Sequence, residues 1–188
     1  MPETPEEFWE RAKGALRTPS VEEWDTWPFD GAVTPRALEP PVAEEPTRHG
    51  EGGADCGHCR EAASALWANE NWFVRALSEP SGLPVVVLLM PKRHVDFPDL
   101  DGQLAGELGP ILHRVYAAVA SVPGVGNVHV GRWGEGSEHC HIWFMGRPAR
   151  MTQLRSSFAA VWDDVLPPTP EDVWRANLEI VRAALERG

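Results

Sequence analysis

Two histidines one residue apart, His139 and His141, lie in a short run whose alternating residue types are typical of a β-strand. Successive side chains of a strand point to opposite faces, so Ser137, His139 and His141 are expected on one face and Cys140 on the other. Two imidazoles on one face can act as a nucleophile with a hydrogen-bonding partner, or as a pair of metal ligands. A half-exposed strand with incidental polar residues would carry the same spacing.

The residues before this pair favour phosphate chemistry. A glycine-rich turn at residues 134–136 offers backbone N–H groups that can hold a phosphate. Arg132 is expected on the facing strand, where its charge could neutralise that phosphate. We therefore take His139 and His141 as candidate catalytic residues, and Arg132 and Ser137 as candidate substrate-binding residues.

A second group of residues has the spacing of a metal site. Cys56 and Cys59 form a C-x-x-C pair after a glycine-rich segment, from which two thiolates can occupy neighbouring corners of a zinc tetrahedron. His94, which follows an apolar strand, is the expected third ligand. A redox pair or two free thiols are the alternatives, but a redox C-x-x-C is expected at the start of a helix that follows a strand. The sequence therefore predicts one Zn²⁺ with a structural role.

Length and composition limit the other possibilities. The chain has 188 residues, enough for one well-buried domain, and a formal net charge of −11, which disfavours binding to nucleic acid polymers and anionic membranes. No apolar run approaches the roughly 20 residues that cross a bilayer, and no signal-peptide pattern follows Met1. Three cysteines suit a reducing compartment. We expect a cytoplasmic protein.

The chain is expected to divide into an N-terminal part, residues 1–54, and a domain over residues 55–188. An amphipathic helix is predicted over residues 3–17. The segment that follows this helix contains too many prolines for a helix or a central strand, so we interpret it as an extended arm. Its apolar residues are expected to hold it against the domain: Trp24, Trp27, Phe29 and Leu38.

The domain is expected to be an α+β unit with a five- or six-stranded antiparallel sheet. Strands near residues 72–77 and 83–91 form one hairpin, and strands over 125–133 and 138–144 form a second. Apolar residues at three-and-four spacing predict a long helix over residues 100–122, on one face of the sheet. Two C-terminal helices are predicted over residues 154–162 and 171–185.

A few other residues have both a chemical and a structural interpretation. Trp133 and Trp143 could stack a nucleobase, although a tryptophan in an alternating strand more often serves packing. Asp163 and Asp164 could hold Mg²⁺, but an acidic pair at a helix end is more often a solvated surface feature. His58, between the two cysteines, is expected at the surface or the edge of the core rather than on the metal.

The order of these parts resembles the histidine-triad (HIT) superfamily: a C-x-x-C, a strand that ends in Pro-Lys-Arg-His94, a long helix, and a strand with His139-x-His141. That superfamily includes nucleoside phosphoramidases, dinucleotide hydrolases and the galactose-1-phosphate uridylyltransferase branch. The resemblance covers about residues 55–147. It implies that His139 attacks the α-phosphorus of a nucleotide and that His141 supports the site through hydrogen bonds.

The resemblance also implies a zinc ion on Cys56, Cys59 and His94, and it leaves the fourth ligand open. The triad of the family begins with a histidine at the position of Ser137, and in zinc-bearing members that histidine completes the site. Water, His129 or His139 could replace it here, and a His139 on the metal could not also be the nucleophile. Domains of this family often pair, so a homodimer is a further expectation.

These observations favour a nucleotide-processing hydrolase or nucleotidyltransferase that acts at an α-phosphate through a nucleotidyl-histidine intermediate. A neutral imidazole attacks readily near pH 7 and leaves again once protonated. Its partner would be a nucleotide or a nucleotide conjugate. One alternative is a non-catalytic, zinc-stabilised module that binds a nucleotide or a protein, and another is a catalytic zinc with an open coordination position.

Overall fold

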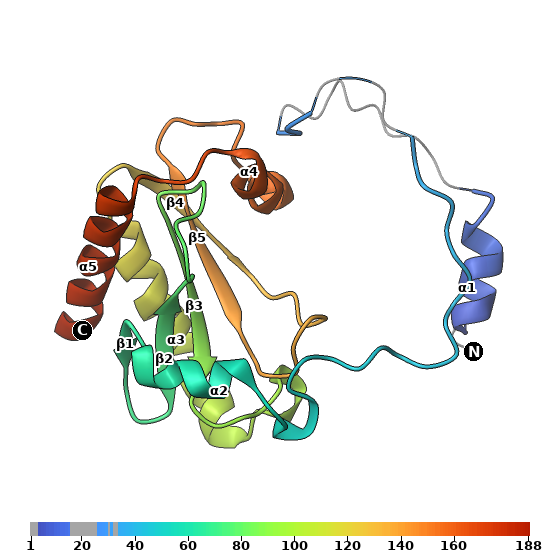
Figure 1. Cartoon of the computed structure of the whole chain (residues 1–188), viewed down its shortest axis with the longest axis horizontal. Helices are drawn as coiled ribbons and strands as arrows, with labels where there is room; N and C mark the ends of the chain where they lie inside the picture. The colour runs from blue at the N-terminus through green and yellow to red at the C-terminus, as the bar shows by residue number, and fades with distance from the viewer. Residues whose placement is uncertain (1–3, 16–25, 30, 32–33) are drawn as a thin grey trace.

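The computed structural model describes residues 4–15, 26–29, 31 and 34–188. In these residues the chain forms a five-stranded antiparallel sheet with the strand order β1-β2-β3-β5-β4 (Figure 1). The strands are β1 (Trp67–Ala68), β2 (Trp72–Ala76), β3 (Val85–Pro91), β4 (Val125–Gly131) and β5 (Ile142–Pro148). The predicted α+β class and the antiparallel sheet are confirmed.

The central hairpin follows from the apolar run in β3. Every residue of β3 is buried, because elements cover both faces of the sheet at this strand. β2 pairs with β3 in the register that joins Trp72 to Pro91 and Ala76 to Val87. Since β3 ends at Pro91, the residues that follow it, including His94, leave the sheet at one end.

The second hairpin differs from the prediction at its turn. β5 begins at Ile142 rather than at residue 138, and Gly131 pairs with Trp143, so His139 and His141 precede the strand. The segment before β5 is bound outside the sheet: the Glu138 N–H donates to the His49 carbonyl at 3.1 Å, and the Cys140 N–H donates to the Val95 carbonyl at 2.9 Å. These partners are distant in sequence and draw the chain away from β4.

The sheet has two differently covered faces. α3 (Gly102–Ala120) and α5 (Glu171–Arg187) pack on one face, where Val87 and Phe144 belong to the largest apolar cluster. Their neighbours Leu88 and Trp143 point to the other face, on which α2 (Gly57–Glu61) and α4 (Ala159–Val165) lie (Figure 1). The long helix on one face is therefore confirmed, and the second face carries the candidate site.

The described residues of the N-terminal arm contact the domain at two places, one near Thr26 and one near His49. α1 (Pro5–Ala12) is shorter than predicted and stands apart from the sheet in Figure 1, with the Trp9 indole N–H donating to the Leu38 carbonyl at 3.0 Å. The first contact with the domain is at Thr26, whose carbonyl accepts a hydrogen bond of 2.7 Å from the Trp162 indole. The second contact is the pairing of His49 with residue 137. Trp24, also expected to hold the arm, lies outside the described residues.

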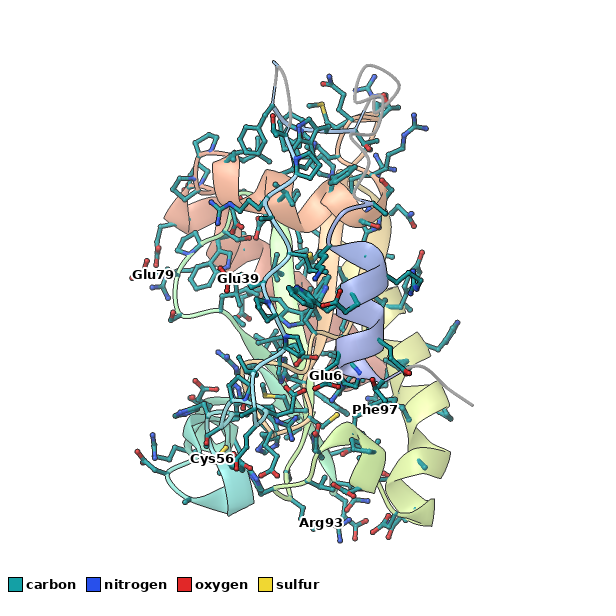
Figure 2. All side chains as sticks on the ribbon, turned by 90° about the vertical axis from the view of Figure 1, so that its right-hand side faces the viewer. Glu6, Glu39, Cys56, Glu79, Arg93 and Phe97 are labelled. Atoms are coloured by element: carbon teal, nitrogen blue, oxygen red, sulfur yellow. The ribbon has the colours of Figure 1, made fainter. Side chains whose placement is uncertain are left out.

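Figure 2 shows Cys56 and Glu79 at opposite ends of the domain. Glu79 lies in the connection between β2 and β3, whereas Cys56 lies near the end of the sheet at which β3 finishes and β5 starts. The chemically interesting side chains gather at this second end. Among the described residues, none of the helices combines the length and the apolar character that a membrane span requires.

One helix-end acid has a structural role that gives a testable pH dependence. A carboxylate oxygen of Asp163 accepts a 2.7 Å hydrogen bond from the N–H of the buried Leu83. Burial raises the pKa of Asp163 above its ordinary value of 3.8, and the bond from Leu83 only partly opposes this. Because the folded state keeps the proton to higher pH, this contribution to stability is full below about pH 3.8 and is lost as the pH rises through the folded pKa.

We therefore expect Asp163→Asn to gain stability relative to the natural chain as the pH rises from 4 to 7. The asparagine amide oxygen can still accept from Leu83, but it carries no charge to desolvate. Urea unfolding across this range measures the effect, with Asp172→Asn, at an exposed position that is not among the causes of the Asp163 shift, as the matched control. Free-energy curves for Asp163→Asn and the natural chain that stay parallel would contradict the prediction.

Candidate metal centre

A tight glycine-rich turn places the first cysteine. Gly50, Gly52 and Gly53 have φ values of 74°, 65° and 79°, in the left-handed region that favours glycine. A Cβ on Gly50 would lie 3.1 Å from the Cβ and 3.2 Å from the Sγ of Cys56, so the backbone can approach this cysteine only without a side chain. Cys56 then caps α2, whose first turn carries Cys59.

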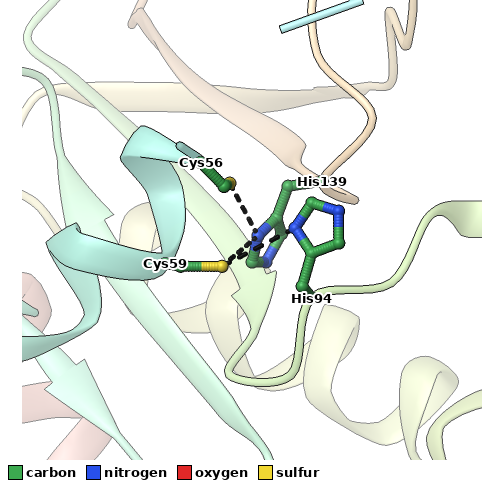
Figure 3. Close-up of side chains that lie close together, drawn as sticks. All are labelled: Cys56, Cys59, His94 and His139. Carbon is green, nitrogen blue, oxygen red and sulfur yellow. Dashed lines mark hydrogen bonds between the residues drawn. The ribbon is translucent and has the colours of Figure 1, made fainter. Parts of the chain in front are cut away.

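Four side chains from three segments meet at this end of the sheet (Figure 3). Cys56, Cys59, His94 and His139 each offer one donor atom, and all four atoms lie within 4.8 Å of one another. The His139 Nδ1 is 3.5 Å from both sulfur atoms, and the His94 Nδ1 is 3.6 Å from the Cys59 sulfur. These residues therefore form a cluster that can hold one metal ion.

The distances match a tetrahedral zinc site. Zn–S bonds of about 2.3 Å and Zn–N bonds of about 2.0 to 2.1 Å at tetrahedral angles put sulfur and nitrogen about 3.5 Å apart. The three sulfur to nitrogen distances in the cluster are 3.5, 3.5 and 3.6 Å. Two thiolates and two imidazoles are also a donor set that Zn²⁺ prefers. The donor chemistry and its spacing thus both fit zinc.

The second nitrogen of each imidazole has a partner that fixes the ring. The His139 Nε2 lies 2.8 Å from the Pro91 carbonyl, to which it donates. The His94 Nε2 lies 3.1 Å from a Glu138 carboxylate oxygen, which also accepts from the Gly52 N–H at 2.6 Å. Such partners leave the lone pair on Nδ1, where it faces the cluster. Burial also lowers the pKa of His139, which keeps this ring in the neutral form that binds metals.

The fourth position of the cluster is filled by His139. His129, the other histidine that could have taken it, lies on β4 opposite Met145 and lines a separate cavity. Ser137, at which the resemblance placed the fourth ligand, instead donates from its hydroxyl to the His49 carbonyl at 3.2 Å. Cys140 is buried outside the cluster, and burial raises its pKa to about 11.

His141 lies beside the cluster, and one of its two ring nitrogens makes a hydrogen bond while the other does not, among the described residues. Its Nδ1 is 2.8 Å from the backbone carbonyl of His139, and the residue is 8% exposed. In the part of the chain that the structure describes, no hydrogen-bond partner is recorded for Nε2. Nδ1 therefore carries the proton, which leaves the lone pair on Nε2.

His58 lies close to both site histidines, which sequence spacing did not reveal. Its ring centroid is 5.6 Å from that of His141 and 5.8 Å from that of His139. Its Nδ1 is 3.0 Å from a Glu61 carboxylate oxygen, and the same oxygen is 2.9 Å from the Arg75 guanidinium. Arg75 lies on β2, so this chain of contacts ties α2 to the sheet beneath it.

Arg132 binds Asp96 and does not contact the metal cluster in the described residues. One of its guanidinium nitrogens donates to Asp96 at 2.8 Å, and Arg48 donates to the other oxygen of Asp96 at 2.7 Å. Arg132 also lies near Cys140, where its charge opposes the effect of burial on the pKa of that thiol. The structure therefore brings together His139, Cys56, Cys59 and His94, with His141 adjacent, and it directs Arg132 and Ser137 to other partners.

Solved structures of histidine-triad proteins share this fold. A hypothetical histidine triad nucleotide-binding protein from Sulfolobus tokodaii strain 7 matches with a TM-score of 0.53 over 70% of this chain and 93% of its own, at 14% identity. A zinc-bound histidine triad family protein from Mycobacterium smegmatis gives a TM-score of 0.51 over 71% and 94%, at 18% identity. A histidine triad protein from Sinorhizobium meliloti 1021 gives 0.52 over 64% and 87%, at 15% identity.

The chain therefore has the histidine-triad fold. Neither a protein-family model nor a curated protein matches its sequence. Identities this low establish the fold alone, so the chemistry has to be argued from the residues of the site.

Proposed function

We propose that this protein is an enzyme that hydrolyses or transfers a nucleotidyl group at its α-phosphate through a nucleotidyl-histidine intermediate. The observation that carries the proposal is the imidazole of His141, which lies beside the cluster of Cys56, Cys59, His94 and His139. Its Nδ1 is bound to a backbone carbonyl, and its Nε2 has no hydrogen-bond partner among the described residues. Such a ring is oriented for attack by Nε2. The sequence resemblance to the histidine-triad superfamily, which implies that a histidine of this segment attacks phosphorus, supports the same chemistry.

A bound zinc would hold this segment in place. Cys56, Cys59, His94 and His139 supply four protein ligands, the number that structural zinc sites use. The ion would fix the ring of His139, and the carbonyl of the same residue orients His141. In this proposal the metal shapes the site and the histidine beside it reacts.

The attacking residue in this proposal is His141 rather than His139. The sequence favoured His139, with His141 in support. However, the Nδ1 of His139 faces the cysteine sulfurs and its Nε2 donates to Pro91, so neither nitrogen has a free lone pair when metal is bound. If His139 is the histidine that completes the zinc site, it takes the first position of the triad, His141 takes the second and Trp143 takes the third.

The reaction then has two displacement steps. The lone pair on the His141 Nε2 forms a bond to the α-phosphorus as the bond from phosphorus to the leaving group breaks, and the leaving group departs with that electron pair. The imidazole becomes a cation, which the hydrogen bond from Nδ1 to the His139 carbonyl stabilises. Water or an acceptor hydroxyl then attacks phosphorus and gives its proton to solvent, which balances the electron pair that the first leaving group took. The Nε2–P bond breaks with its electron pair on Nε2, which returns His141 to its starting form.

The proposal is tested by trapping the intermediate. We expect mass spectrometry of the zinc-loaded protein, mixed with adenosine 5′-phosphoramidate, dinucleoside polyphosphates or nucleotide sugars, to find a nucleotidyl adduct on the peptide that contains His141. The mixture should be quenched in base, because the phosphorus–nitrogen bond of phosphohistidine breaks in acid. An adduct on another residue, or turnover with no covalent species, would contradict the proposed mechanism.

A second candidate function is a non-catalytic module that binds a nucleotide or a protein. Trp143 favours it, because a tryptophan at the third triad position cannot exchange protons with a phosphate as a histidine can. The binding of Arg132 to Asp96 favours it as well, since this guanidinium is not free to neutralise a phosphate. Tight nucleotide binding without any adduct or turnover would select the module over the enzyme.

A further inference from the structure

Residues 48–53 lie against the segment that carries His139, and we call them the strap. The His49 N–H donates to the Gly136 carbonyl at 3.1 Å, and the His49 carbonyl accepts from the Glu138 N–H at 3.1 Å. Both bonds are made by backbone atoms, so they depend on the path of the strap rather than on its side chains. A short backbone bridge therefore holds the strap beside a metal ligand of the site.

The backbone of the strap also packs against two of the metal ligands. A Cβ on Gly53 would lie 3.5 Å from Cδ2 of the His94 ring, and a Cβ on Gly50 would lie 3.1 Å from the Cβ of Cys56. Since glycine has no side chain, the main chain itself forms these contacts. A displacement of either ligand would therefore disturb the strap.

Glu138 bonds to the strap and to a metal ligand through the same oxygen atom. This carboxylate oxygen accepts from the Gly52 N–H at 2.6 Å and from the His94 Nε2 at 3.1 Å. The other oxygen is 3.9 Å from the Arg48 guanidinium. The Glu138 side chain is 24% exposed, so water is partly excluded from these bonds. Because both donors meet at one oxygen, the position of the His94 ring and the position of the strap depend on each other.

Arg48 anchors the first residue of the strap in the domain. Its guanidinium donates to Asp96 at 2.7 Å and to the Gly134 carbonyl at 3.2 Å. The Asp96 side chain is 5% exposed, and a carboxylate this deeply buried needs its charged partners. Arg48 is not a member of the metal cluster, so its hydrogen bonds act on zinc only through the strap.

We infer that Glu138 couples the strap to the metal, so that zinc binding at His94 and docking of residues 48–53 stabilise each other. Zinc on the His94 Nδ1 fixes the ring with its Nε2–H toward Glu138, which then holds the Gly52 N–H. In the other direction, the docked strap holds Glu138 in the position that accepts from the His94 ring. Glu138 is thus a positioning residue, and the strap is a metal-dependent tether for the N-terminal arm.

This coupling has to be reciprocal. Any stabilisation that zinc gives to the docked strap is returned as an equal gain in zinc affinity when the strap is docked. A residue of the strap that binds no metal should therefore affect how tightly zinc is held. The inference goes beyond the proposed function and does not rest on it, because it involves no reaction at His141.

The first test measures the zinc affinity of the whole chain by competition with a metal chelator. Arg48→Ala is expected to weaken zinc binding about fivefold, which is at the low end of typical coupling between two sites. Electrostatics alone predicts the opposite, because removal of a positive charge near a cation strengthens the binding of that cation. Arg36→Ala, which removes the same charge from an exposed position of the arm outside the strap, is the matched control.

Glu138 is tested in the same assay. Glu138→Ala is expected to weaken zinc binding at least about tenfold, since loss of a partner of a ligating imidazole typically costs roughly 10- to 100-fold in affinity. Glu138→Gln should restore most of this affinity, because the amide oxygen can accept from both donors. Glu135→Gln removes the same charge from a nearby exposed position and is the matched control.

The second test follows the strap itself by hydrogen exchange at saturating zinc. The amides of residues 48–53 should exchange about fivefold faster in Arg48→Ala and in Glu138→Ala than in the natural chain, as expected for the loss of one hydrogen bond. The amides of β3 should keep their protection, which shows that the fold is intact. Because the two variants loosen the contact from opposite sides, either one that keeps β3 protected decides the question.

Three results would overturn the inference. The first is a zinc affinity that is unchanged or higher in Arg48→Ala. The second is an equal loss of affinity in Glu138→Ala and Glu135→Gln, which would assign the effect to charge rather than to hydrogen bonds. The third is the same exchange rate for residues 48–53 in every variant. None of these results depends on an adduct at His141, so the proposed function keeps its own separate test.

Discussion

Replacement of both Cys56 and Cys59 by serine is expected to abolish zinc binding and to lower the free energy of unfolding by about 4 kcal/mol, because zinc binding to a structural site is part of the folding free energy. The cluster joins the start of α2 to the segment after β3 and to the segment before β5. Serine hydroxyls are poor zinc ligands at neutral pH, so only two histidines would remain. Elemental analysis of protein purified without added zinc should give one zinc per natural chain and none per variant.

Cys140→Ala is the matched control for this loss. Cys140 is the third cysteine of the chain, is buried like Cys56, and lies outside the cluster. It should keep its zinc whatever it costs in packing. Chelation should lower the melting temperature of the natural protein and of Cys140→Ala but leave that of the double variant unchanged. A double variant that keeps both its zinc and its melting temperature would refute the metal site.

Local patterns in the sequence predicted most elements of this fold because those elements depend on nearby residues. The apolar run of β3 and the three-and-four spacing of α3 are local, and both elements formed near the predicted residues. The start of β5 is not local. It is set by the hydrogen bonds that Glu138 and Cys140 make to His49 and Val95, which a strand pattern cannot anticipate.

In the site, too, local patterns predicted some residues, while contacts between distant residues placed the others. The C-x-x-C spacing and the strand-end position indicated Cys56, Cys59 and His94 as ligands, and these three side chains do meet. The fourth position depended on the direction of the His139 ring, which the Pro91 carbonyl fixes from another segment. The placement of Arg132 beside Asp96 likewise needs a contact between distant residues. Glu138 accepts a hydrogen bond from the ligating imidazole of His94. The sequence signal for this role was only that Glu138 stands next to His139.

The two histidines that drew attention in the sequence should respond differently to replacement. His141→Ala is expected to keep its zinc and its melting temperature and to lose turnover by at least about 10³-fold, because it removes the nucleophile and nothing from the cluster. His139→Ala is expected to lose zinc and stability, and activity only as a consequence, because it removes one of four ligands. Zinc content, melting temperature and turnover of adenosine 5′-phosphoramidate measure the three effects.

Chemical rescue distinguishes a nucleophile from a residue that only supports the site. In His141→Gly, added imidazole can occupy the vacated space and attack phosphorus in place of the missing ring, so turnover should rise with imidazole concentration. His139→Gly should not recover in this way, because its defect is the loss of a ligand that the Pro91 carbonyl and two cysteines orient. Suppose instead that His139→Ala keeps its zinc and loses the adduct, while His141→Ala still forms one. The attacking nitrogen would then belong to His139, and the fourth zinc ligand would have to come from elsewhere.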